Sequence, residues 1–215
     1  MRRFRHTLVT FWYMTSLVYN LAGALSWPLM HAVYRLQVTG LENVPEGGAV
    51  LAANHTSNFD PWPLGFPLWP GRQLYFMGKA ELFNPVLGPV LLSAGAFPVR
   101  RGEHDVQAIE TAVRLCKEGK LVAMFPEGTR REKGLRKKFA ARPRGGSARI
   151  ALAAGVPLVP VAIMGTDRML NLPRLKVAYG KPIPLDDLTG LPPKDAVDTA
   201  TQRVMAEIQA LYEGL

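Results

Sequence analysis

From Val38 onward, short apolar runs alternate with longer amphipathic stretches, a pattern typical of an α/β sheet. The clearest helix is predicted over about His104–Lys117, with acidic residues at its start and Gly119 after its end. Two more helices are predicted over Gly146–Ala154 and Lys194–Tyr212. The predicted strands are Ala49–Asn54, Leu74–Met77, Ala96–Val99, Leu121–Phe125, Leu158–Ile163 and Lys176–Tyr179. Because prolines and glycines punctuate the chain without forming a linker, we expect one domain over residues 37–215.

A different pattern occupies residues 1–36. Three arginines precede residues 7–34, a stretch of 28 residues without Lys, Arg, Asp or Glu. This stretch exceeds the roughly 20 residues that cross a bilayer as one helix. It also contains aromatic residues that favour the lipid–water interface: Trp12, Tyr13, Tyr19, Trp27 and Tyr34. Residues 1–36 are therefore predicted to bind a membrane.

Three arrangements of this segment fit the pattern. A single span with its arginines inside would carry the rest of the chain out of the cytoplasm. Alternatively, a turn at Asn20–Gly23 would separate two short helices that dip into one leaflet. The first of these, Thr7–Tyr19, would be about 20 Å long, short of a ~30 Å hydrocarbon core. The second would begin near Ser26 and Pro28. A buried pair of hydrophobic helices is the third arrangement.

Composition and charge limit the classes of ligand that the protein is expected to bind. A chain of 215 residues with 48% apolar residues is a globular protein of about one domain. The 26 Lys and Arg against 17 Asp and Glu give a net charge of +9, which favours nucleic acid, acidic lipid or a phosphorylated small molecule. The single cysteine, Cys116, excludes an internal disulfide and a multi-cysteine metal site, and its helical spacing with apolar residues predicts a core position. The four histidines show no metal-ligand spacing, so we expect no metal.

The most informative motif lies between Leu51 and Pro61. An apolar run ends at Asn54, His55 follows, and Asp60 comes five residues after the histidine. This spacing is wrong for one helical face, so the imidazole and the carboxylate have to meet across a turn. Asp60 precedes a proline, which favours an extended backbone and a helix N-cap at this residue. Such a turn would leave one ring nitrogen of His55 free to take a proton.

A second motif, Phe125–Arg130, follows a predicted buried strand. It therefore sits at the strand's carboxyl end, where open α/β sheets bind ligands. Gly128 allows close backbone approach, Thr129 offers a hydroxyl, and the guanidinium of Arg130 can hold two phosphate oxygens.

Two further segments add candidate residues. Gly95–Gly102 places Arg100 and Arg101 just past a predicted strand, and only one of them is expected in the site because adjacent side chains of an extended segment point to opposite faces. In Val156–Val161, Pro160 removes a backbone donor, which indicates an edge, a bulge or a lining against a ligand.

A basic loop lies between Arg130 and Arg144, with eight positive charges against Glu132 alone. Near a membrane each positive charge can add about 1 kcal/mol of attraction to anionic lipid. The same positive charges could equally bind the phosphates of a carrier or an acidic carrier protein, or the loop could simply be solvated. Nucleic acid is not expected, because Phe139 is the only aromatic residue in the run and stacking platforms need several.

Together these motifs resemble the glycerolipid acyltransferase family, most closely the bacterial 1-acyl-sn-glycerol-3-phosphate acyltransferases. Four segments occur in the family's order and spacing, within about residues 40–180: Asn54–Asp60, Gly95–Arg101, Phe125–Arg130 and Val156–Val161. The resemblance implies one α/β domain with a mixed, largely parallel sheet flanked by helices, after an N-terminal membrane-binding helical hairpin. One departure is that Pro143–Gly146 stands where relatives often have Phe-Lys-x-Gly, so Arg144 keeps the charge but not the geometry of lysine.

The resemblance implies transfer of a fatty acyl group from a thioester to the 2-hydroxyl of lysophosphatidate, which gives phosphatidate. His55 is then the general base, Asp60 holds its ring, and Arg130 with Arg100 or Arg101 binds the acceptor phosphate. Glu127 either orients these basic groups or contacts the glycerol.

The donor is acyl-CoA or acyl carrier protein as co-substrate, with no bound cofactor. Because these substrates are cytoplasmic, we expect the half-immersed hairpin, with the catalytic domain on the cytoplasmic face of a cytoplasmic or inner membrane. Three other functions compete: acylation of another lysophospholipid, glycerol 3-phosphate or a non-phosphorylated alcohol, a non-catalytic module that binds anionic lipid, and a hydrolase. The hydrolase is disfavoured because the chain has no Gly-x-Ser-x-Gly motif.

Overall fold

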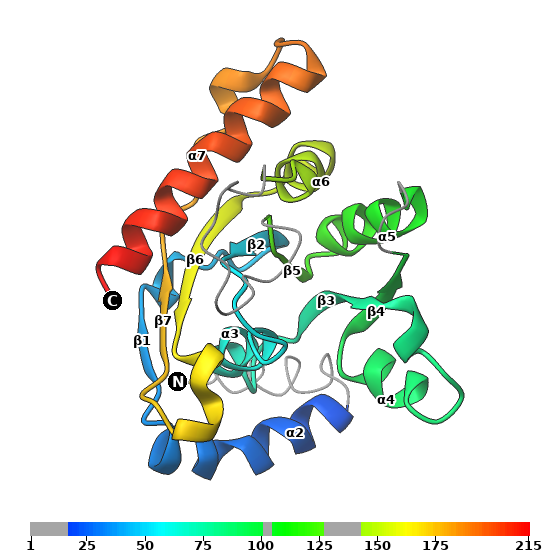
Figure 1. Ribbon diagram of the computed structural model, residues 1–215. Coiled ribbons are helices and arrows are strands. Elements are labelled where there is room, and N and C mark those ends of the chain that lie inside the picture. The colour runs from blue at the N-terminus through cyan, green and yellow to red at the C-terminus, as the bar shows by residue number, and fades with distance from the viewer. Residues whose placement is uncertain (1–16, 101–104, 127–142) are drawn as a thin grey trace, which may run out of the picture.

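A computed structural model describes residues 17–100, 105–126 and 143–215. These residues form a sheet with the strand order β1-β7-β6-β2-β5-β3-β4 (Figure 1). The strands are β1 (Gln37–Thr39), β2 (Ala49–Ala53), β3 (Leu74–Lys79), β4 (Ala96–Val99), β5 (Leu121–Met124), β6 (Leu158–Met164) and β7 (Lys176–Tyr179). Neighbouring strands are parallel except β6 and β7, which are antiparallel. The prediction of a mixed, largely parallel sheet is therefore confirmed.

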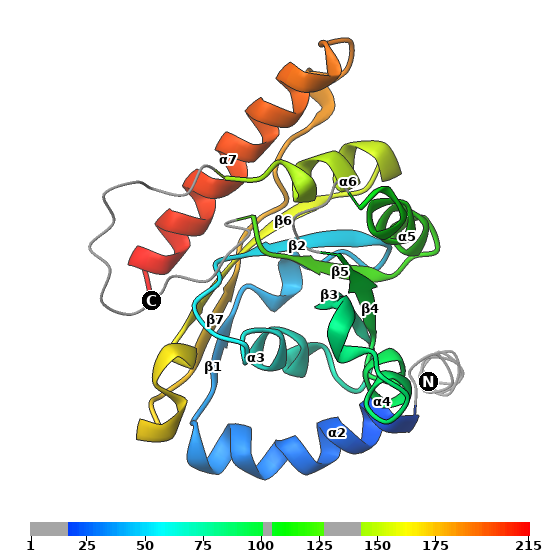
Figure 2. The same ribbon diagram turned by 45° about the vertical axis from the view of Figure 1, so that its right-hand side comes forward.

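Helices lie on both sides of this sheet (Figure 2). One face is covered by α5 (Val106–Lys117), α6 (Gly146–Ala154) and α7 (Pro193–Glu213). The other side carries α2 (Leu17–Pro28), α3 (Pro61–Gly65) and α4 (Gly88–Ser93). Short helical turns are η1 (Leu29–Val33), η2 (Leu41–Asn43), η3 (Phe66–Leu68), η4 (Ala80–Leu82), η5 (Thr166–Asn171) and η6 (Asp186–Leu188).

Strand β2 lies at the centre of the hydrophobic core. All five of its residues are fully buried, because its side chains alternate between two apolar layers. Val50 and Ala52 pack in the layer formed with α5, α6 and α7. Leu51 packs in the opposite layer, beside Leu64 of α3. Because β2 is held on both faces, the turn that follows it starts from a fixed point.

The six predicted strands and the three predicted helices of the body are present, with small differences at their ends. The sequence analysis missed β1, an exposed strand whose single half-buried residue is Val38. A lone apolar position gives no alternation to read, and β1 is held by parallel pairing with β7, more than 130 residues later in the chain.

The predicted turn at Asn20–Gly23 is wrong, because these residues lie inside the continuous helix α2. A Cβ at Gly23 would lie 2.5 Å from the indole of Trp69, so this glycine allows close packing of the helix rather than a turn. Asn20 accepts a hydrogen bond from Trp69 Nε1 at 3.2 Å, and Ser26 accepts one from Trp62 Nε1 at 2.8 Å. Ser26 and Pro28 belong to α2, and the helical turn η1 follows directly from Leu29 without an intervening turn.

The described residues contain no helix that is both long and apolar enough to cross a membrane. The N-terminal helix expected from the family resemblance is present as α2. The proposed division of the chain at residue 36 stays a prediction.

The edge position considered for Pro160 is wrong, because β6 lies between β7 and β2. The N–H of Gly180 donates to the Pro160 carbonyl oxygen at 2.8 Å. In an antiparallel pair the missing N–H of Pro160 would point the same way, toward residue 180, which lies just beyond the end of β7. A central strand can contain this proline because the N–H group that proline lacks would face Gly180, a residue beyond the end of β7.

Candidate active site

The predicted catalytic residues lie at the carboxyl ends of two neighbouring strands. His55 follows β2 and Phe125 follows β5, and these strands pair in parallel with Leu51 opposite Ala123. The two rings stack, with their centroids 4.2 Å apart and their planes inclined by 20°. The topology therefore joins the start of the Phe125–Arg130 motif to the histidine of the first motif.

Asn54 fixes the point at which the chain leaves β2. Its side-chain amide donates to the Ile163 carbonyl oxygen at 2.9 Å, and its Oδ1 accepts from the Ile163 N–H at 2.7 Å. These two bonds satisfy both backbone groups of one residue of β6 inside the protein. Asn54 thus continues the sheet with its side chain and orients the backbone from which His55 projects.

The predicted contact between His55 and Asp60 is present. The Nδ1 atom of His55 lies 2.7 Å from Asp60 Oδ2, and the two residues are 7% and 0% exposed. A carboxylate can only accept, so Nδ1 carries the proton that is shared with Asp60. The Nε2 atom of His55 has no hydrogen-bond partner among the described residues, and in this tautomer it is the basic nitrogen.

The Asp60 carboxylate also organises the turn between the two residues. Its Oδ2 accepts from the backbone N–H groups of Thr56 at 2.8 Å and Ser57 at 2.9 Å. The hydroxyl of Thr166, in η5, donates to Oδ1. These donors hold the buried negative charge in one orientation, which in turn fixes the imidazole.

The predicted capping role of Asp60 is wrong in its details. Asp60 does occupy the position before α3, but its backbone is helical (φ −53°, ψ −39°) and its side chain makes no capping bond to that helix. The carboxylate instead turns back toward the donors that precede it in the chain. A residue before proline prefers an extended backbone, but here the hydrogen bonds from the preceding backbone N–H groups to the carboxylate outweigh that preference.

A largely apolar pocket of about 720 Å³ opens beside His55. Its walls come from α2, α3, β3 and the segment around α4. Tyr19 of α2 ties these walls together, because its hydroxyl donates to the Gly65 carbonyl oxygen at 3.1 Å and accepts from the Leu74 N–H. Burial raises the pKa of Tyr19 to about 12, so this hydroxyl stays protonated near neutral pH. The pocket can hold a long aliphatic group next to a basic nitrogen.

The predicted substrate-binding residues divide into three groups. The first lies outside the described residues: Arg101, Glu127, Gly128, Thr129 and Arg130. The second group lies outside the pocket beside His55. Arg100 is exposed just after β4, and Arg144 lines a separate hollow of about 490 Å³ together with Arg149. Met77 lines both this hollow and the pocket beside His55. The third is Pro160, whose ring shares the α7 side of the sheet with Leu158 and does not line the pocket of His55.

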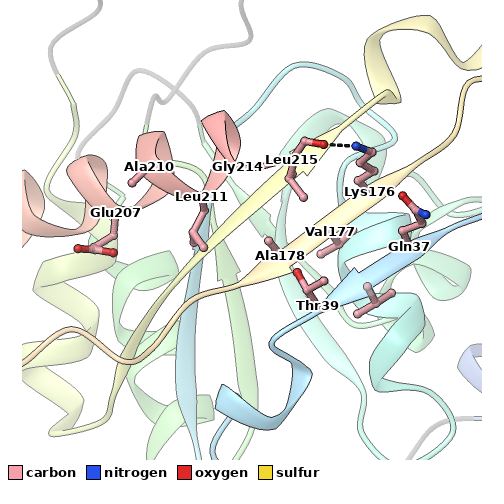
Figure 3. A pocket seen from close by; sticks show the side chains of 11 residues that line it. Gln37, Thr39, Lys176, Val177, Ala178, Glu207, Ala210, Leu211, Gly214 and Leu215 are labelled. Atoms are coloured by element: carbon pink, nitrogen blue, oxygen red, sulfur yellow. Dashed lines mark hydrogen bonds between the residues drawn. The ribbon is translucent and has the colours of Figure 1, made fainter.

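Figure 3 shows another hollow, of about 750 Å³, between β1, β7 and the end of α7. There Lys176 Nζ donates to the Leu215 carbonyl oxygen. None of the predicted site residues that the structure describes lines this hollow, which separates it from the chemistry around His55.

Three residues of the site escaped the sequence analysis: Asn54 as an anchor, Phe125 as a stacking partner and Thr166 as a donor to Asp60. Asn54 and Phe125 flank the two motifs and could have been found as the ends of buried strands. Thr166 lies 106 residues from Asp60, and its sequence carries no signal of the contact.

Comparison with known proteins agrees with this geometry. Residues 35–164 match the family model described as Acyltransferase. The chain is 32% identical over 185 residues to a 1-acyl-sn-glycerol-3-phosphate acyltransferase of Bacillus subtilis, covering 84% of this chain and 89% of that protein. It is 30% identical over 169 residues to the protein of the same name from Streptococcus pneumoniae, with 76% and 60% covered.

The fold also resembles a solved structure. The crystal structure of the 1-acyl-sn-glycerophosphate (LPA) acyltransferase PlsC from Thermotoga maritima aligns with a TM-score of 0.61 at 24% identity, covering 88% of this chain and 76% of that one. At this identity the likeness supports the fold. With the family model matching more than half of its length, the chain belongs to the acyltransferase family.

Proposed function

We propose that this acyltransferase moves a fatty acyl group from a thioester to the 2-hydroxyl of 1-acyl-sn-glycerol 3-phosphate and so makes phosphatidate for phospholipid synthesis. The observation that carries the proposal is the buried His55–Asp60 pair, which opens onto an apolar pocket next to a hollow lined by Arg144. The names of the relatives from Bacillus and Streptococcus support the choice of acceptor.

In the proposed mechanism, Nε2 of His55 takes the proton of the acceptor hydroxyl as its oxygen attacks the thioester carbonyl. Asp60 accepts the Nδ1 hydrogen and stabilises the imidazolium that forms. When the carbon–sulfur bond breaks, the proton passes from Nε2 to the departing thiolate. The balance is one ester formed, one thioester broken and one thiol released.

The proposal assigns each substrate to a part of the site on grounds of charge and shape. The pocket beside His55 accommodates an acyl chain, because its lining is mainly apolar. Arg130, with Arg100 or Arg101, binds the acceptor phosphate, and Gly128 and Thr129 add donors. Arg144 lies at the same edge of the sheet, since its N–H donates to the Pro126 carbonyl oxygen at 2.7 Å. Glu127 orients these arginines or contacts the glycerol.

The donor in the proposal is acyl-CoA or acyl carrier protein, and the reaction takes place at the cytoplasmic face of a membrane. Helix α2 supports membrane association, because Leu17, Leu21 and Leu25 are 75%, 54% and 74% exposed on it. Exposed leucines along one helix are typical of a helix that lies in the lipid interface.

A panel of acceptors tests the proposal. Purified protein in detergent is given a radiolabelled acyl-CoA and, in separate reactions, lysophosphatidate, another lysophospholipid, glycerol 3-phosphate or monoacylglycerol. We expect labelled phosphatidate from lysophosphatidate and little product from the uncharged monoacylglycerol. Efficient transfer to a different acceptor, with none to lysophosphatidate, would redirect the assignment. The His55→Ala variant, prepared identically, is the control for a contaminating enzyme, because it should form no product.

A further inference from the structure

A second apolar surface lies away from α2 in sequence. Residues 82–99 contain no Lys, Arg, Asp or Glu over 18 consecutive positions. Five large apolar side chains of this run are exposed, by 42% to 85%: Leu82, Val86, Leu87, Val90 and Leu92. Five exposed aliphatic side chains within eleven residues are unusual on the surface of a soluble protein and indicate an interaction site.

The segment presents these side chains from an ordered turn. The Asn84 side-chain oxygen accepts from the N–H groups of Val86 at 3.1 Å and Leu87 at 2.9 Å. The N–H of Gly88 donates to the Asn84 carbonyl oxygen at 2.8 Å, and α4 begins there. The tip of the turn therefore satisfies its backbone donors internally, which is what entry into a region without water requires.

This surface continues that of α2. Helices α2 and α4 pack against each other and lie together on the side of the molecule opposite α7 (Figure 2). Both segments line the pocket beside His55, with Tyr19 and Ala22 from α2, Leu91 from α4, and Leu82 from the turn η4 that precedes α4. Both segments thus border the same pocket, and both also carry exposed aliphatic side chains.

We propose that residues 82–92 are a second membrane-contacting element, which inserts its aliphatic tip into the bilayer beside α2. The inference rests on the proposed action at a membrane. The side chains that the tip exposes are Val and Leu without charge, whereas the cores of protein interfaces favour aromatic residues and arginine. With six residues, α4 is far too short to span the bilayer, so the contact is shallow. Two elements then flank the pocket, and a lipid chain passes from the leaflet to His55 without crossing water.

A fluorescent label at the tip tests the contact directly. Val86 is 85% exposed, so a cysteine in its place (Val86→Cys) can be labelled with an environment-sensitive fluorophore. The native Cys116 is 1% exposed, and burial raises the pKa of its thiol to about 12, so it should not react. The matched control is Gln202→Cys on the exposed side of α7. We expect a blue shift and quenching by spin-labelled lipid for the label at position 86, and neither for position 202, when vesicles of phosphatidylglycerol and phosphatidylethanolamine are added.

A pair of charge substitutions gives an independent measurement. Leu87 and Leu191 are 42% and 44% exposed, at the tip of the segment and before α7 respectively. We expect Leu87→Asp to weaken sedimentation with the same vesicles at least roughly tenfold, because it removes an apolar side chain from the bilayer and adds a charge. Leu191→Asp should leave vesicle binding unchanged, and both variants should keep acyl transfer in detergent.

The outcomes separate this inference from the proposed function. Vesicle binding with the position 86 label still in water, or equal binding of both Asp variants, would overturn the second contact while leaving the transfer reaction intact. A blue shift that appears without vesicles as protein concentration rises would assign the surface to a second copy of the chain. Absence of all vesicle binding would overturn both the contact and the membrane location, and the acceptor panel in detergent would still test the chemistry.

Discussion

Replacing Asp60 by Asn tests whether the buried carboxylate acts through its charge. An asparagine can place its amide oxygen at the Oδ2 position, where it would keep the hydrogen bonds from His55 Nδ1 and from the N–H groups of Thr56 and Ser57. Its NH₂ group would then face the hydroxyls of Thr56 and Thr166, which can rotate to accept. The geometry should survive, and the negative charge is lost.

We therefore expect Asp60→Asn to stay folded and to lose about 10²- to 10⁴-fold in kcat, the range of general acid–base catalysis that the charge of Asp60 supports through His55. That loss corresponds to about 3–5 kcal/mol of transition-state stabilisation. The assay measures thiol release from acyl-CoA with lysophosphatidate in detergent, and urea unfolding measures stability in parallel. A kcat within tenfold of the wild type, at unchanged stability, would refute the role of the charge.

Asp60→Ala is the matched structural control. It leaves the N–H groups of Thr56 and Ser57 without their acceptor. An unpaired buried donor costs about 1–3 kcal/mol, and because these two are half-buried we expect about 2–3 kcal/mol of destabilisation in all. If Asp60→Asn proved as unstable as Asp60→Ala, the amide would not fit the turn, and the argument from hydrogen-bond geometry would be wrong.

Three further predictions concern the frame around the site. Asn54→Ala should destabilise the protein by about 2–4 kcal/mol in urea unfolding, because both buried backbone groups of Ile163 lose their partner; a change under about 1 kcal/mol would contradict this. Gly23→Ala should also destabilise, by about 1–3 kcal/mol, because its Cβ would meet the indole of Trp69 at 2.5 Å. A gain in stability, as expected for Ala in an unhindered helix, would show that α2 does not pack this closely. Asp105 accepts two backbone N–H groups, which lower its pKa, so its stabilising effect is complete above about pH 5 and is lost as pH falls through the lowered pKa. The difference in Tm between the wild type and Asp105→Ala should therefore shrink between about pH 5 and pH 3.

Local sequence patterns predicted what depends on neighbouring residues. Asp60 comes five residues after His55, so a turn could join them. The apolar runs around Leu51 and Leu121 were recognised as strands because each is short and continuously apolar. Phe125, the first residue of its motif, was expected at the carboxyl end of a buried strand, and its stacking with His55 confirms that position.

What the sequence analysis missed depends on distant partners. Gly23 was interpreted as a turn because the indole of Trp69 that crowds it lies 46 residues further on. Pro160 was expected at an edge, at a bulge or against a ligand, because its tolerance inside the sheet depends on where β7 stops pairing, which the local sequence does not reveal. The direction of the Asp60 carboxylate likewise depends on several competing hydrogen-bond donors, one of them on the distant Thr166, and local sequence rules do not say which donors win.

Helix α2 contributes Tyr19, Ala22, Gly23 and Ser26 to the wall of the pocket beside His55. Removing α2 to obtain a better-behaved enzyme would therefore also remove part of the pocket that is proposed to bind the acyl chain. An inactive truncated protein would be no proof that catalysis needs a lipid surface, and anchoring is better probed by point changes on the outward side of the helix.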